Sequence, residues 1–299
     1  MDRENRTWTC LSGFILKLIA FLTMALDHVG LVLQMNVGEN YGLAIGFRVI
    51  GRLALPLFCF LIAEGFYHTK KPGTYLLRLG IMATIIAVAE IVIVQTPLFE
   101  EYGLGEIRKF GNIYTDLILG GLGVLLLKQK KWYFQVLSAV PFLIGFAGFI
   151  ANSLEQSENI IIHWFPYFLR PQYGFYGIGM IMLFYVAHLL KGLFLKGYSD
   201  KSGIPVESLQ DTQIERKAYN LIAMGVLVIW TLLYYLIGCM IPPLWVTWDV
   251  VIQNVAIVSG AFILLYSGKR GYNAKWFQYG SYLFYPVHIV IIFLIGMLF

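Results

Sequence analysis

The chain has 299 residues, of which 59% are hydrophobic and only 13% charged, and its mean hydropathy is +0.71. A soluble domain carries about 25% charged residues, so this composition excludes a soluble globular protein. The formal net charge is +5, and three cysteines without Cys-x-x-Cys spacing indicate neither a disulfide framework nor a zinc site.

Apolar stretches of about 20 residues recur along the chain, each long enough to cross the hydrocarbon core of a bilayer as a helix. They cover residues 11–35, 47–67, 76–96, 112–127, 133–151, 172–195, 218–241, 247–267 and 277–298. The stretch 160–170 is apolar at its start, but Pro166 and Pro171 favour an interfacial or re-entrant segment, and the count becomes ten if it crosses. The sequence therefore predicts an all-α, polytopic integral membrane protein with nine to ten transmembrane helices in a single bundle, forming one domain over residues 1–299.

Lysine and arginine collect in alternate loops between these stretches. The positive loops contain Lys70, Lys71 and Arg78, then Lys128, Lys130 and Lys131, then Lys191, Lys196, Lys201, Arg216 and Lys217, and finally Lys269, Arg270 and Lys275. The other loops carry Glu39, Glu100, Glu101, Glu106, Glu155 and Glu158, alongside Arg108, Lys109 and Arg170. Because positive loops normally stay cytoplasmic, we expect the N-terminus to lie inside. The net charge follows from this rule and does not indicate nucleic-acid binding.

Ionisable residues inside the first two stretches are the strongest functional signal. Asp27 and His28 lie late in the first stretch, and Arg48 and Arg52 follow in the second. Such groups cost at least a few kcal/mol each at membrane depth, so they are kept mainly where they line a polar cavity or do chemistry. His28 lies about 10 Å below the outer end of its helix, and Arg52 has a similar depth. Arg48 and Arg52 are four residues apart and share a helix face, although Arg48 alternatively snorkels to lipid phosphates.

Later stretches offer further polar groups to the same outer half of the bilayer. These are Asn112 and Asp116, which are spaced i, i+4, then Tyr173 and Tyr176, and finally Ser281, Tyr285 and His288 on one helix stripe. Most have a structural alternative: an aromatic belt for Tyr173 and Tyr176, a helix N-cap for Asn112 and a counter-ion of an arginine for Asp116. For His28 and His288 the alternative is a buried histidine that is hydrogen-bonded for stability. Glu64 is expected to be structural, and His188 is expected at the interface because it lies near the end of its stretch.

Several of these residues belong to motifs that resemble the TraX family. The motifs are Asp27-His28-Val29-Gly30 and Phe284-Tyr285-Pro286-Val287-His288, together with residues 16–20, 48–56, 64–66, 68–69, 75–79, 112–113, 173–177 and 267–271. The resemblance covers most of the chain and is weak over 137–169 and 199–248. It implies a role in N-terminal acetylation of pilin in the bacterial cytoplasmic membrane. That family in turn looks like a branch of the transmembrane acyltransferases related to the acyltransferase type three proteins, whose active site is marked by a histidine and an arginine pair. The matching residues are His28 and, with a spacing of four instead of three, Arg48 and Arg52.

The expected function is therefore transfer of an acetyl group from cytosolic acetyl-CoA to an amine or hydroxyl of an extracytoplasmic acceptor, which is a pilin-like peptide, a glycan or a lipid. His28 suits the general base, because a neutral imidazole accepts a proton near pH 7. Asp27 points about 100° away from His28 and is expected to pair with an arginine of the second helix. Arg48 and Arg52 are expected to hold the donor or the developing oxyanion.

The donor and the acceptor are expected at different depths. Lys17 precedes His28 by eleven residues, which places it on the same face about 16 Å nearer the cytoplasm, where Lys70 and Arg78 also lie. We expect these three cations, with Lys71, to receive the nucleotide phosphates of acetyl-CoA. Alternatively, the loop lysines are ordinary positive-inside residues. Contacts with the acceptor are expected from Asn112, Asp116, Tyr173, Tyr176, Tyr285 and His288, and no metal is expected.

Two other classes of function use the same residues. In a proton-coupled transporter or flippase, Asp27, Arg52, Asp116 and His288 line the substrate path. In the other, the protein is a non-catalytic membrane component of a conjugation or secretion assembly.

Overall fold

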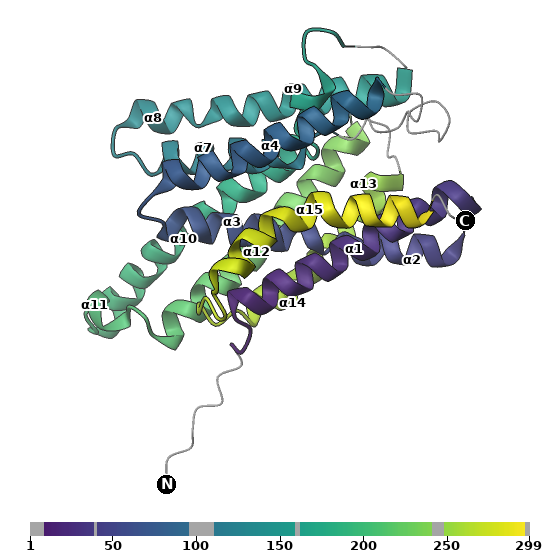
Figure 1. The fold of residues 1–299 in the computed structure, drawn as a ribbon. Helices are drawn as coiled ribbons and strands as arrows, with labels where there is room; N and C mark the ends of the chain where they lie inside the picture. The colour runs from purple at the N-terminus through teal and green to yellow at the C-terminus, as the bar shows by residue number, and fades with distance from the viewer. Residues whose placement is uncertain (1–8, 39–40, 96–110, 159–161, 241–247, 297–299) are drawn as a thin grey trace.

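The computed structural model describes residues 9–38, 41–95, 111–158, 162–240 and 248–296 (Figure 1). The described elements are helices, and seven segments are long and apolar enough to cross a membrane: Gly13–Val37, Gly42–His68, Pro72–Val94, Trp132–Glu155, Phe175–Ser202, Gln213–Met240 and Lys275–Gly296. Two shorter apolar helices, Ile113–Leu127 and Val251–Leu264, occupy the other two predicted stretches. The prediction of an all-α polytopic membrane protein is confirmed.

Helix α10 (Phe175–Ser202) lies at the centre of the bundle and packs against α3 (Ala54–His68), α7 (Ile113–Leu127), α9 (Ala139–Glu158) and α12 (Gln213–Met240). Along it, Tyr176 and Phe184 join a continuous buried core that includes Phe60, Phe66 and Tyr219.

Helix α1 (Gly13–Val37) packs against α2 (Gly42–Gly51), α3 and α15 (Lys275–Gly296). In Figure 1 the yellow α15 runs beside the purple α1, so the two ends of the chain contribute to one wall of the bundle. Helix α15 also contacts α4 (Pro72–Val94), and most of its remaining surface is exposed, as expected for a lipid-facing helix.

The second predicted stretch is broken into two helices, α2 and α3, at Arg52 and Leu53. Pro56 explains the break, because proline has no N–H to donate to the carbonyl of residue 52 and its ring clashes with that carbonyl. Arg48 and Arg52 therefore do not lie in one unbroken α-helix, but both reach Asp27, so the shared side expected for them is kept. Arg52 instead occupies the break, just after the end of α2.

Two glycines let α1 and α2 approach closely. A Cβ atom at Gly51 would lie 2.2 Å from the Cβ of Asp27, and one at Gly30 would lie 2.8 Å from the carbonyl oxygen of Ala44. Only glycine leaves room for the opposing helix at these positions. The close approach places Asp27 directly against α2.

The remaining predicted stretches match observed helices, but their ends are shifted and two of them are divided into shorter helices. The stretch 133–151 is α8 (Trp132–Leu137) followed by α9, and 247–267 is α13 (Trp248–Gln253), η4 (Asn254–Val258) and α14 (Ser259–Leu264). Between α9 and α10, the described part of 160–170 contains only the short helix η2 (Tyr167–Leu169) and does not cross as a helix. The polar connection before α12 contains α11 (Val206–Leu209). The expected boundaries at 96, 241, 247 and 298 lie outside the described residues.

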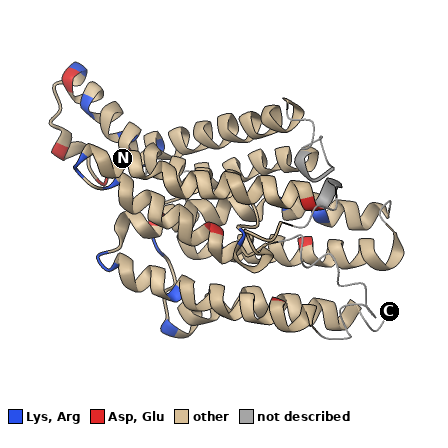
Figure 2. Ribbon diagram, turned by 90° about the horizontal axis from the view of Figure 1, so that it is seen from above, with Lys and Arg blue, Asp and Glu red and all other residues tan. Residues whose placement is uncertain are grey.

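Most of the Lys and Arg residues, blue in Figure 2, lie toward one end of the bundle. We call this the lysine-rich end and define it by Lys70, Lys71, Lys128, Lys269 and Arg270. Lys128 donates to the carbonyl oxygens of Phe66 and Tyr67 at the end of α3, at 3.1 and 3.2 Å. The acidic residues Glu39, Glu100, Glu101 and Glu106 lie outside the described residues, and the assignment of the lysine-rich end to the cytoplasm stays a prediction.

Candidate functional site

A buried ion-pair cluster joins α1 to the α2–α3 break. Asp27 accepts a hydrogen bond from Arg48 at 2.9 Å and one from Arg52 at 3.4 Å. All three residues are less than a tenth exposed, so Arg48 does not snorkel to lipid phosphates as its alternative role requires. Arg52 also reaches Oε1 of Gln253 at 3.5 Å. The expected salt bridge between Asp27 and the arginines is present.

The residue next to Asp27, His28, lies in a histidine pair with His288 of α15. Their rings meet edge to face with centroids 4.9 Å apart, and Nε2 of His288 lies 3.1 Å from Nδ1 of His28. Nδ1 of His288 also lies 2.6 Å from the carbonyl oxygen of Phe284, and Nδ1 of His28 lies 2.9 Å from that of Met24.

These contacts select one tautomer for each ring when both are neutral. A carbonyl oxygen only accepts, so Nδ1 of His288 carries its hydrogen and Nε2 of His288 becomes an acceptor. Nδ1 of His28 then donates, shared between Nε2 of His288 and the carbonyl of Met24. Nε2 of His28 is left with the lone pair, and it makes none of the hydrogen bonds found between described residues. His28 therefore presents a basic nitrogen on the side away from His288.

Aromatic rings surround this pair. The Tyr285 ring meets His28 edge to face at 6.2 Å, and Phe284 stacks on His288 at 4.8 Å. The hydroxyl of Tyr285 donates to Oε1 of Gln172 at 3.3 Å. Tyr114 packs edge-on against Tyr285 at 5.7 Å. The predicted stripe on the last helix, with Tyr285 and His288, does face His28.

The side chains of Asn112 and Asp116 bond to backbone groups around the site. Asn112 is the N-cap of α7, where its side chain accepts from the N–H of Tyr114 at 3.0 Å and donates to the carbonyl of Ala83 at 2.9 Å. The carboxylate of Asp116 accepts from the N–H of Gln172 at 2.6 Å and of Tyr173 at 3.2 Å. The N-cap role of Asn112 is confirmed, whereas contacts of these two side chains with a substrate stay predictions.

Tyr173 and Tyr176 have different environments. Tyr173 lies near Asp27, Arg48 and Arg52, beside the ion-pair cluster. Tyr176 is only 1% exposed, and its hydroxyl lies 3.0 Å from Oγ1 of Thr231 in the core. The aromatic-belt alternative is wrong for Tyr176, because this side chain does not reach the interface.

Two of the three cations expected to bind the donor each lie against a ring near the start of α15. Nζ of Lys17 lies 5.6 Å from the ring centre of Phe277, and the Arg78 guanidinium carbon lies 5.6 Å from that of Tyr279. Lys70 is exposed at the same end of the bundle. From Phe277 to His288, α15 rises about 16 Å, so one helix connects these cations with the histidine pair.

A second polar centre lies near the lysine-rich end, around Glu64. Its carboxylate lies 2.7 Å from Nε2 of His188 and accepts from the Tyr266 hydroxyl at 3.0 Å. The His188 ring is stacked between Tyr67 and Tyr219, with centroids 3.7 and 4.0 Å away. His188 is 5% exposed and lies inside the bundle, and its expected depth at the interface stays a prediction. These contacts tie α3 to α10 and α12 and support the structural role expected for Glu64.

Two polar residues near the site were missed by the sequence analysis. Glu90 lies within the apolar stretch 76–96, and its Oε2 is buried with no hydrogen-bond partner among the described residues. It interacts electrostatically with Tyr285. A charged residue inside an apolar stretch is itself a signal that could have revealed Glu90. Gln172 had no such signal, because a glutamine at the first position of a predicted stretch is ordinary. Within the described part of the chain, no three His, Cys, Asp or Glu side chains are grouped to hold a metal ion.

The fold and these clusters define a multi-pass membrane protein with an intramembrane polar site between its first and last described helices. A family model described as TraX protein matches residues 12–193, and the chain belongs to this family.

Two relatives extend this comparison. The chain is 26% identical over 295 residues to the probable fimbrial assembly protein FimC, serogroup H1, of Dichelobacter nodosus, a match that covers 94% of each chain. It is 25% identical over 173 residues to uncharacterized protein RP591 of Rickettsia prowazekii (strain Madrid E), covering 58% of this chain and 54% of that protein. No solved structure matches the chain.

Proposed function

We propose that this protein is a membrane-embedded acetyltransferase that moves an acetyl group from cytosolic acetyl-CoA to an amine or hydroxyl of an acceptor on the other side of the membrane. The observation that carries the proposal is the His28–His288 pair, in which Nδ1 of His28 is engaged and Nε2 keeps its lone pair. A histidine held in one tautomer by a second group is the arrangement that general-base catalysis needs.

The histidine pair accounts for the proton in such a transfer. Nε2 of His28 takes the proton of the acceptor as its nitrogen or oxygen attacks the thioester carbonyl. The carbon–sulfur bond then breaks, and the proton on His28 passes to the leaving thiolate, so that the products are the acetylated acceptor and CoA. While His28 is charged, its Nδ1 hydrogen remains bonded to His288, which stabilises the imidazolium.

The ion-pair cluster supports the charge that develops on the carbonyl oxygen. Asp27, the residue before His28, is buried and orients Arg48 and Arg52 through its ion pairs with them. Positive groups fixed in a low-dielectric site stabilise an oxyanion more than they do in water. We assign Arg48 and Arg52 this role, with Asp27 as the residue that orients them.

Lys17, Lys70 and Arg78 are assigned to the phosphates of the donor at the lysine-rich end. This assignment requires that end to face the cytoplasm, in line with the positive-inside rule and an N-terminus inside. The pantetheine arm then follows α15 toward His288. The proposed contacts on the acceptor side remain Asn112, Asp116, Tyr173, Tyr176, Tyr285 and His288.

The acceptor class follows from the family rather than from the geometry. The relative from Dichelobacter nodosus is described as a fimbrial assembly protein, so the first acceptor to test is the amino group of a pilin-like peptide. Glycans and lipid headgroups are the next classes. The relation to the acyltransferase type three proteins is part of the same proposal.

The test is release of free thiol from acetyl-CoA by the purified protein in nanodiscs, with a synthetic pilin-like peptide or an envelope extract as acceptor. Wild type is compared with His28→Ala and with His163→Ala, an exposed histidine in the loop before α10 that serves as the matched control. The proposal predicts thiol release that is lost in His28→Ala and kept in His163→Ala. Folded wild-type protein that neither binds nor turns over acetyl-CoA contradicts it.

A proton-coupled transporter is the second candidate, because paired histidines and a buried Asp–Arg cluster also suit proton movement across a bilayer. Solute uptake into proteoliposomes that depends on a pH gradient, with no thiol release, would favour this candidate.

A further inference from the structure

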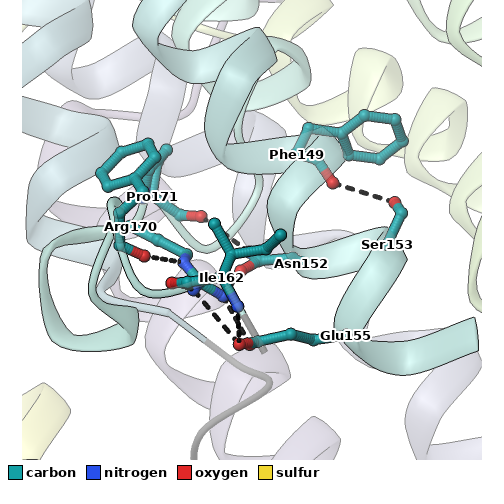
Figure 3. A network of polar contacts seen from close by, with 8 residues as sticks. Phe149, Asn152, Ser153, Glu155, Ile162, Arg170 and Pro171 are labelled. Carbon is teal, nitrogen blue, oxygen red and sulfur yellow. Dashed lines mark hydrogen bonds and ion pairs between the residues drawn. The ribbon is translucent and has the colours of Figure 1, made fainter. Parts of the chain in front are cut away.

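The segment between α9 and α10 is folded around one buried arginine, Arg170 (Figure 3). The guanidinium donates to the carboxylate of Glu155 at 2.5 and 3.2 Å, to Oδ1 of Asn152 at 3.5 Å and to the carbonyl of Ile162 at 2.8 Å. Its Nε also donates to the carbonyl of Phe165. Arg170 thus binds α9 through Asn152 and Glu155. It also binds its own segment through the carbonyls of Ile162 and Phe165.

This pattern uses the whole donor set of the guanidinium. Arg170 is 1% exposed, so each of its N–H groups must find a partner inside the protein. Removing one partner of such a buried pair leaves an uncompensated charge. The contacts therefore select one conformation for residues 162–171.

The backbone that leaves Arg170 runs directly to the site. Its own carbonyl accepts from the N–H of Asn112 at 2.7 Å, and the carbonyl of Pro171 accepts from Asn152 at 3.2 Å. The next residue, Gln172, has its N–H held by Asp116 at 2.6 Å and its side-chain Oε1 bonded to the hydroxyl of Tyr285 at 3.3 Å.

Tyr285 completes the connection to the histidine pair. Its ring lies edge to face with both His28, at 6.2 Å, and His288, at 5.8 Å. Among the described residues, the Tyr285 hydroxyl bonds to Gln172, and this bond together with packing against Tyr114 fixes the position of the ring. An arginine on the α9 side of the molecule is therefore linked by consecutive contacts to the proposed general base.

We propose that Arg170 is a positioning residue, which acts through Gln172 and Tyr285 to hold the His28–His288 pair in its reactive orientation. This inference rests on the proposed acetyl transfer for its catalytic consequence, whereas the contact path can be tested without activity. The simpler possibility, that Arg170 only anchors the loop, makes a different prediction in each arm of the experiment.

The first arm measures amide hydrogen exchange of the full-length protein in nanodiscs, for wild type, Arg170→Gln and Gln172→Leu. Arg170→Gln is expected to speed exchange by about tenfold in residues 162–173 and also in the Tyr285–His288 region of α15. Exchange in α12, which lies off the path, is expected to stay at the wild-type rate. Gln172→Leu is expected to reproduce the effect on α15 alone, and it keeps the test decisive if Arg170→Gln does not fold.

The second arm measures acetyl transfer. Each single variant is expected to lower kcat by about tenfold with an unchanged KM for acetyl-CoA, and the double variant to be no worse than either, because both act through one path. Arg170→Lys, which keeps the charge, is expected to recover part of kcat.

Additive losses, or faster exchange confined to residues 162–173, would overturn the positioning role and leave Arg170 as a loop anchor. If wild type shows no transfer at all, the proposed function fails, and the exchange data still decide whether the path from Arg170 to α15 exists.

Discussion

Nε2 of His288 lies 3.1 Å from Nδ1 of His28 although 260 positions separate the two residues in the sequence. The pair joins α1 to α15 within the bundle, and its hydrogen bonds to the carbonyls of Met24 and Phe284 determine which ring nitrogen of His28 is basic. A residue at each end of the chain is thus needed to complete the proposed base.

Replacing His288 tests whether it orients His28. In His288→Ala, the Nδ1 hydrogen of His28 loses one of its two acceptors, so the tautomer is less well defined. We expect kcat for thiol release to fall about 10- to 100-fold, less than the loss in His28→Ala. The double variant should match His28→Ala, because the two rings act as one unit. A double variant clearly slower than His28→Ala contradicts this account.

Neutralising Asp27 tests the ion-pair cluster. Asp27→Asn leaves Arg48 and Arg52 buried without their anionic partner, and breaking a buried pair costs about 3–5 kcal/mol. We expect a clearly lower thermal unfolding midpoint in detergent. Replacing Arg48 by Met in the same chain should restore part of the loss, since one buried charge is removed. An unfolding midpoint equal to that of wild type would show that the cluster contributes little.

A glycine pair on α2 tests the close approach of α1. Gly51→Ala places a Cβ 2.2 Å from the Cβ of Asp27, whereas a Cβ at Gly46 meets no atom within 4 Å. We expect Gly51→Ala to destabilise the protein by about 1–3 kcal/mol and to reduce transfer, since Asp27 must move. Gly46→Ala should be neutral or slightly stabilising, because alanine favours a helix. Equal unfolding midpoints for the two variants would contradict the α1–α2 geometry.

Donor binding is tested by charge removal at the start of α15. Lys17→Gln and Arg78→Gln should each raise KM for acetyl-CoA by about tenfold with little change in kcat, because they remove contacts made equally in the ground state and the transition state. The loss should shrink at high salt, where phosphate contacts are screened. Lys130→Gln, an exposed lysine beyond α7, is the control and should leave KM unchanged. A tenfold loss in kcat with an unchanged KM would contradict a role of Lys17 and Arg78 in donor binding.

Orientation is tested by labelling single cysteines in a background without Cys10, Cys59 and Cys239. Lys70→Cys should react with a membrane-impermeant maleimide only in inverted vesicles, because positive loops stay cytoplasmic. Trp164→Cys, at a side chain 74% exposed in the loop before α10, should react in intact spheroplasts. The reverse pattern would invert the proposed topology and with it the path of the donor.

The sequence by itself determined the class of fold, because apolar length dictates helices in a membrane where every backbone group must be bonded internally. It also determined local relationships. Neighbouring residues diverge by about 100° around a helix, which predicts that Asp27 pairs with the second helix and not with His28. The N-cap at Asn112 likewise depends only on adjacent residues.

Only the tertiary structure decided which polar groups meet. Periodicity assigns a residue a helix face and a depth, but not the helix that lies opposite, so the pairing of His28 with His288 and the burial of His188 between Tyr67 and Tyr219 followed from packing alone. The path from Arg170 through Gln172 to Tyr285 depends on a loop whose conformation is selected by contacts with α9. Such contacts join residues distant in sequence, and their geometry is settled only when the helices that carry them have packed.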